Sequence, residues 1–126
     1  MAMTNYLSNA LANAVVRNTS YTSPATVYCA LYSTAPTVST SGTELTGSNY
    51  SRQAVTFSAP SGGNAASNVS VTFGAASADW SPAVAISIVD ASTSGNILYF
   101  NTITTQVVKS GSSLTIASGD ITVTMT

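Results

Sequence analysis

The stretch 83–100, AVAISIVDASTSGNILYF, constrains the fold more than any other part of the chain. Two apolar runs, 83–89 and 97–100, flank a turn-forming segment that ends in Gly95-Asn96. β-Branched and aromatic runs around such a segment predict an antiparallel β-hairpin. Both arms are apolar on successive residues, which is typical of strands covered on both faces. We therefore expect this hairpin at the centre of the fold, with its second face covered by a second layer or by a partner chain.

Short β-like segments separated by turn residues account for most of the remaining chain. They lie at 26–33, 50–59, 68–73, 101–109, 114–116 and 121–125. Strands at this spacing predict an all-β fold, an antiparallel β-sandwich of about 6 to 8 short strands. We expect one domain over 1–126, with the sandwich over 26–126. Cys29 is expected to be a buried thiol, and Val69 is expected to point inward with Val71 and Phe73.

One helix signal precedes the strands, at about 4–17. Apolar residues recur there every four positions: Leu7, Leu11 and Val15. This spacing predicts an amphipathic helix with Thr4 as N-cap and Arg17 at its C-terminal end. So short a helix is marginal in water by itself, so its apolar stripe must dock on the sheet or on a neighbouring subunit.

A polar loop over 37–48 is the other segment that we expect to meet a partner. Loops of about a dozen residues are uncommon in small domains and are usually functional or mobile. The candidate partner-contact residues of the helix and this loop are Leu7, Leu11, Val15, Thr37, Ser41 and Glu44.

Composition limits the function classes. The chain is 44% hydrophobic but only 6% charged, against about a quarter charged in ordinary soluble domains. Little charge repulsion opposes association, which favours a protein docked in an assembly; the alternative is a Ser/Thr-rich β-domain of an extracellular type. Three basic residues are too few to hold nucleic acid, and no segment suits a membrane. One cysteine and no signal peptide predict synthesis in a reducing cytoplasm.

The sequence carries no recognisable catalytic motif. It has no histidine, and its carboxylates, Glu44, Asp79, Asp90 and Asp120, show no metal-binding spacing. We therefore expect no enzymatic activity, no catalytic residue, no cofactor and no metal. In so uncharged a chain an inward-pointing Arg52 needs a partner, and Asp90 is the predicted one. The alternative is that both are solvated charges at strand ends.

Several segments resemble a known family. They are TVYCALYSTAPT (26–37), SGTELTGSNYSRQAVTF (41–57), SNVSVTF (67–73) and IVDASTSGNILYF (88–100). They are similar to a family of short tailed-bacteriophage virion structural proteins, often labelled tail fibre or decoration-like, and 47–52 and 90–99 are the most specific pieces. Members commonly have glycine after the tryptophan, where this chain has Ser81-Pro82. The resemblance implies a virion component without enzymatic activity.

A compact, barely charged domain without fibrous repeats favours a capsid-surface cement or decoration protein. Its expected partners are the major capsid protein and copies of itself, as a homo-oligomer for which a trimer is one option. The alternative is a tail- or baseplate-associated protein, such as a small fibre adaptor. A further alternative is a carbohydrate-binding module. The sugar-stacking side chains of such a module would be Tyr28, Tyr32, Tyr50, Trp80 and Tyr99. The favoured interpretation of these aromatic residues is that they fill the core and its rim.

Overall fold

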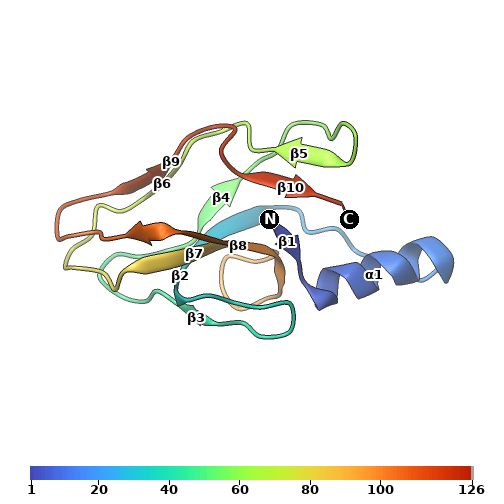
Figure 1. The fold of residues 1–126 in the computed structure, drawn as a ribbon, viewed down its shortest axis with the longest axis horizontal. Helices are drawn as coiled ribbons and strands as arrows, with labels where there is room; N and C mark the ends of the chain where they lie inside the picture. Colours follow the sequence, from blue (N-terminus) through green and yellow to red (C-terminus); the bar gives the residue numbers. More distant parts are fainter. Residues whose placement is uncertain (126) are drawn as a thin grey trace.

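The computed structural model of the protein describes residues 1–125. Over this range it contains one helix, α1 (Asn5–Val16), and ten strands in three antiparallel sheets (Figure 1). The strands are β1 (Ala2–Met3), β2 (Val27–Thr34), β3 (Thr43–Glu44), β4 (Gln53–Val55), β5 (Asn64–Ala66), β6 (Val71–Phe73), β7 (Ala83–Val89), β8 (Ile97–Gln106), β9 (Leu114–Ile116) and β10 (Thr122–Thr124). The all-β class with one N-terminal helix is confirmed. The structure has more strands than the 6 to 8 predicted because several strands are only two or three residues long. Thr126, the last residue of the predicted sandwich, lies outside the described residues.

The predicted hairpin is confirmed and lies in the middle of the largest sheet. That sheet has the order β1-β8-β7-β2-β3, and β4 also pairs with β2. Strand β7 pairs with β8 on one side and with β2 on the other. In the connecting turn Gly95 has φ +75°, and a Cβ there would lie 2.3 Å from the Asp90 carboxylate. Only glycine fits this position without rearranging the turn.

Both faces of β7 and β2 are buried, as their continuous apolar runs predicted. One face contributes Leu31 and Ile88 to the main core, while the other packs Ala30 and Ala85 in a smaller cluster. On that second face the buried Ser87 hydroxyl donates a hydrogen bond of 2.9 Å to the Tyr32 hydroxyl. The protein's own chain covers this face, so the hairpin itself needs no partner.

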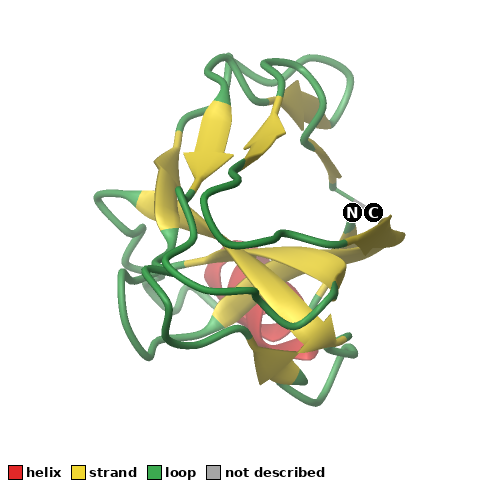
Figure 2. Ribbon diagram, turned by 90° about the vertical axis from the view of Figure 1, so that its left-hand side faces the viewer, coloured by secondary structure: helices red, strands yellow, loops and turns green. Residues whose placement is uncertain are grey.

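Two small sheets, β5–β10 and β6–β9, form a second layer on one side of the main sheet (Figure 2). Val71 and Phe73 of β6, with Ile121 just before β10, are at most 2% exposed and close the main core. Val69, in contrast, is 39% exposed. The prediction that it points inward is wrong because β6 begins only at Val71.

The helix is held at its first turn. Thr4 is the N-cap, as predicted: its Oγ1 accepts a hydrogen bond from the Leu7 amide and donates one of 2.6 Å to the Ile97 carbonyl. Leu7 is buried against the sheet, whereas Val15 and Val16 are 81% and 76% exposed. The helix thus extends past the edge of the body (Figure 1). Of the predicted apolar stripe, Leu7 and Leu11 pack on the core and Val15 does not.

Candidate functional site

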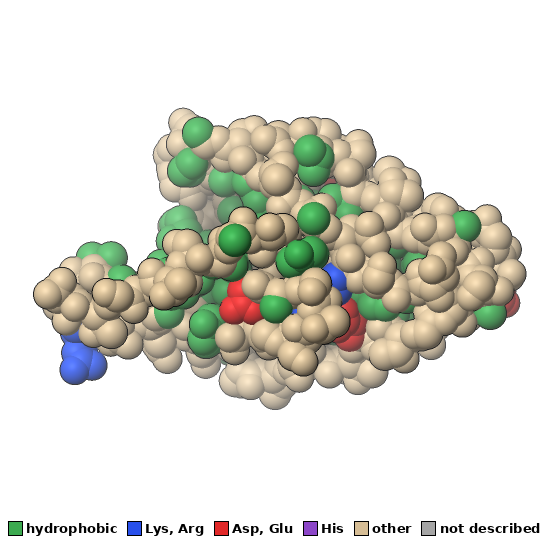
Figure 3. Space-filling view, turned by 180° about the vertical axis from the view of Figure 1, so that it is seen from behind, with side chains coloured by type: hydrophobic (Ala, Val, Ile, Leu, Met, Phe, Trp, Pro, Cys, Tyr) green, Lys and Arg blue, Asp and Glu red, His purple; other side chains and the backbone are tan. Residues whose placement is uncertain are grey.

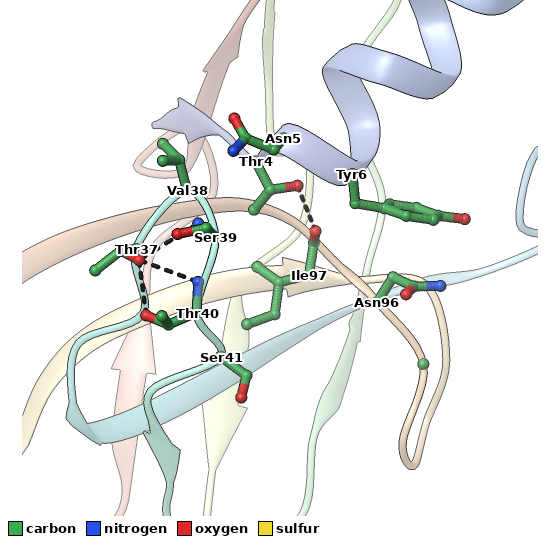
Figure 4. A pocket seen from close by; sticks show the side chains of 11 residues that line it. Thr4, Asn5, Tyr6, Thr37, Val38, Ser39, Thr40, Ser41, Asn96 and Ile97 are labelled. Atoms are coloured by element: carbon green, nitrogen blue, oxygen red, sulfur yellow. Dashed lines mark hydrogen bonds between the residues drawn. The ribbon is translucent and has the colours of Figure 1, made fainter.

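A surface groove forms where α1, the loop after β2 and the central hairpin turn meet (Figure 4). We call it the helix–loop groove; its volume is about 360 Å³. It is lined by Thr4, Asn5, Tyr6, Thr37, Val38, Ser39, Thr40, Ser41, Gly95, Asn96 and Ile97. The two segments predicted to contact a partner, the helix and the polar loop, therefore share one surface.

Hydrogen bonds fix the loop side of this groove. The Asn5 amide donates to the Val38 carbonyl at 2.9 Å, which ties the loop to the start of α1. Thr37 Oγ1 accepts from the Thr40 amide at 3.0 Å and lies 2.7 Å from the Thr40 hydroxyl. The first half of the loop is therefore a closed, ordered turn that lies against the body of the protein.

The lining of the groove is neutral. Hydroxyl and amide groups alternate with the apolar side chains of Val38 and Ile97, and Tyr6 stands at one side with 44% of its surface exposed. This arrangement can hydrogen-bond a neutral polar segment while covering a small apolar contact. It offers no nucleophile–base pair. Across residues 1–125 no three His, Cys, Asp or Glu side chains gather as a metal site would need.

The partly buried Arg52 binds Glu44 rather than the predicted Asp90. Its Nε and Nη2 donate to the two carboxylate oxygens of Glu44, both at 2.9 Å. Only 11% of the Arg52 side chain and 23% of the Glu44 side chain are exposed. This two-point geometry is the one that guanidinium and carboxylate groups prefer. The hydrogen bond with Glu44 raises the pKa of Arg52.

Arg52 nevertheless reaches the turn that contains Asp90. Its Nη1 donates to the carbonyls of Ala91 and Ser94, at 2.8 and 2.7 Å. The Asp90 carboxylate instead accepts from the Asn96 amide at 2.7 Å and so stabilises its own turn. The predicted ion pair with Asp90 is wrong because that carboxylate is satisfied within the hairpin. The pairing of β3 with β2 places Glu44 beside Arg52. No pattern in the sequence identified β3 as a strand.

The predicted partner-contact residues fall into two groups. Leu7 is buried, and Glu44 is held by Arg52 and by the Tyr50 hydroxyl at 2.7 Å, so both serve the fold. The other four retain exposed surface: Leu11 is half-buried, Thr37 and Ser41 line the helix–loop groove, and Val15 lies at the open end of the helix. Sequence reasoning missed Tyr6, Val16 and Val38, which are exposed apolar side chains near the same segments.

The aromatic residues do not form sugar-stacking platforms. Tyr32, Trp80 and Tyr99 are at most 8% exposed. The Tyr50 ring stacks on Phe73 at a centroid distance of 6.1 Å and meets Trp80 edge-on at 5.7 Å. Tyr28 is half-buried against the smaller cluster. The alternative of a stacking platform for carbohydrate is therefore wrong, and the favoured interpretation, that these residues fill the core and its rim, is confirmed.

Cys29 is fully buried, as expected, and burial raises the pKa of its thiol to about 12. A thiol in this environment stays protonated and is not a nucleophile at neutral pH.

A protein-family model matches nearly the whole chain. Residues 2–124 match the family model described as Gp80, Podophage GP4 fiber I protein gp80. No curated protein matches the chain. Over residues 1–125, no helix has the length and apolar character that crossing a membrane requires.

Proposed function

Because the chain belongs to the family of the podophage GP4 fiber I protein gp80, a family of phage virion structural proteins, we propose that it is a tail-associated component of the virion of a short-tailed phage. It acts by contact with neighbouring subunits, without a chemical step, a cofactor or a metal. The family match over residues 2–124 is the observation that supports a tail role. The open end of α1, where two valines remain exposed on a chain with few charges, supports action by contact with neighbours.

The open helix end is costly in an isolated molecule. A helix of twelve residues depends on packing for its stability, because helices of this length are marginal in water. Burying Val15 and Val16 against a neighbour would contribute about 1.5–3 kcal/mol for each side chain. A neighbouring subunit on this surface would therefore stabilise both the contact and the helix.

The helix–loop groove supplies a second surface of different character. Its hydroxyl and amide groups suit the neutral main chain or polar side chains of another virion protein. Since no charged side chain lines it, contacts made there would depend little on ionic strength. Such a surface suits a permanent contact between structural subunits.

The second candidate is the capsid decoration role expected from composition, in which the partners are the major capsid protein and copies of this chain. The scarcity of charge and the lack of fibrous repeats in the sequence favour it. Both candidates use the same surfaces and differ in where the neighbours lie.

Counting copies in purified virions tests the proposal. For a tail component we expect on the order of ten copies per particle, which leave the heads when tails are detached. Hundreds of copies that stay with DNA-filled heads would favour capsid decoration. Absence of the protein from mature particles would overturn both candidates.

A further inference from the structure

We propose that two copies of this chain contact head to tail, with the open end of α1 from one copy seated in a groove at the far end of the next. The helix end consists of Val15, Val16 and Arg17. The receiving surface, which we call the distal groove, lies between β8 and β9. This inference goes beyond the proposed function and does not depend on whether the protein sits on the tail or the capsid.

The helix end has the shape and chemistry of an inserting element. Val15 and Val16 are both more than three-quarters exposed. Arg17 follows at the C-cap, and its guanidinium contacts only Asn13 of its own helix, at 3.4 Å. The result is an apolar tip that carries one positive charge.

The distal groove has the complementary character. Ile103, Leu114 and Ile116 are half-buried and line it together with Ile86, and its volume is about 320 Å³. Asn101, Gln106, Thr115 and Asp120 also line the groove, so its surface is partly polar. Its four apolar residues and its one acidic residue complement an apolar tip with one positive charge.

The remaining charges of the described chain are already matched. Arg52 pairs with Glu44, Lys109 pairs with Asp79, and Asp90 accepts hydrogen bonds from Asn96. Over residues 1–125, Arg17 and Asp120 are the remaining ionised side chains without an ion pair. The Arg17 guanidinium contacts only the neutral side chain of Asn13 within this range. They have opposite signs. Arg17 follows two exposed valines, and Asp120 lines a groove whose residues Ile103, Leu114 and Ile116 are only partly buried.

The two surfaces lie at opposite ends of the molecule. In Figure 1, where the longest axis is horizontal, α1 extends from one end, and β9 with the terminal part of β8 lies toward the other. Seen from behind, the helix end stands out from the body, and charged side chains are few on the visible face (Figure 3). One copy therefore cannot fill its own groove. The contact joins unlike surfaces and generates a ring or a row of copies.

Charge reversal tests this contact in the full-length protein by sedimentation equilibrium. Arg17→Asp and Asp120→Arg should each weaken self-association about tenfold, because each places like charges together. An equimolar mixture of the two variants should regain association, since each copy then meets a neighbour of opposite charge at both surfaces. A mixture that associates no better than its components would overturn the proposal, as would a wild-type protein that stays monomeric at millimolar concentration.

Apolar substitutions give an independent test. The double substitution Val15→Asn and Val16→Asn should weaken association about a hundredfold, because two apolar contacts are lost. Valine and asparagine have similar helix propensity, so circular dichroism should show an unchanged fold. Val15→Ile with Val16→Ile, which keeps both side chains apolar and β-branched, is the matched control and should associate like wild type. Equal loss in the control, or no loss in the Asn double variant, would overturn the proposal.

Discussion

Replacing Arg52 with methionine removes the charged group that ties the Glu44 strand to the central hairpin turn, while it keeps most of the aliphatic side chain. Arg52 makes four hydrogen bonds, two with the Glu44 carboxylate and two with turn carbonyls. Each hydrogen bond of a charged group contributes about 1.5–3 kcal/mol when taken alone, but such values do not add within one network. Because Glu44 retains partial exposure and its bond with Tyr50, we expect a loss of about 3 kcal/mol in the free energy of unfolding.

Chemical denaturation followed by tryptophan fluorescence measures this loss, since Trp80 lies in the core. For a domain of this size the melting temperature should fall by about 10 °C. Lys109→Met is the matched control. Its pair with Asp79 spans 3.5 Å between side chains that are 68% and 58% exposed, so its denaturation midpoint should stay close to that of wild type.

The double variant Arg52→Met with Glu44→Gln distinguishes the contribution of the Arg52–Glu44 ion pair from that of the hydrogen bonds between Arg52 and the turn carbonyls. It should be less destabilised than the sum of the two single variants, because no charge is left without its partner. If Arg52→Met unfolded within about 0.5 kcal/mol of wild type, or matched Lys109→Met, the two-point ion pair would not stabilise the fold and the reasoning would be refuted.

Three further predictions concern other parts of the fold. Thr4→Ala should lower the free energy of unfolding by about 1–2 kcal/mol in urea titrations, because it removes both the helix cap and the bond to the Ile97 carbonyl; an unchanged midpoint would contradict this. Cys29 should resist alkylation at pH 8 in the native protein and react fully in denaturant, and rapid native labelling would contradict its burial. Burial raises the pKa of the Tyr50 hydroxyl above the ordinary value of 10.0, so on raising the pH the unfolded state loses the hydroxyl proton before the folded state does. The contribution of this hydroxyl to the free energy of unfolding is therefore complete below pH 10 and declines as the pH rises above it. Denaturation midpoints that stay constant between pH 9 and pH 11, about one unit below and above the ordinary tyrosine pKa, would refute this assignment.

The centre of the fold could be predicted because its signals are local. The continuous apolar runs of the hairpin and the Thr4 cap each depend on neighbouring residues in the chain. The smaller strands were harder to place. Strand β3 has two residues and exists only because β2 offers a partner edge, so no pattern within it indicates a strand.

The candidate site was predicted in part. Its segments, the helix and the polar loop, were identified from periodicity and composition, but their contact with the hairpin turn depends on tertiary packing. The partner of Arg52 was missed for the same reason. Asp90 lies at the correct turn, yet a short-range bond to Asn96 satisfies it first, and such competition between local and distant partners cannot be read from spacing.

Strand β2 has hydrogen-bonded neighbours on both sides and buried residues on both faces. Its backbone amides between Cys29 and Tyr32 should therefore be the last in the molecule to exchange with deuterium, because only opening of the whole domain exposes them. The outer turns of α1 should exchange first. Such a gradient would let the rim of the protein adjust to a neighbour while its middle stays closed.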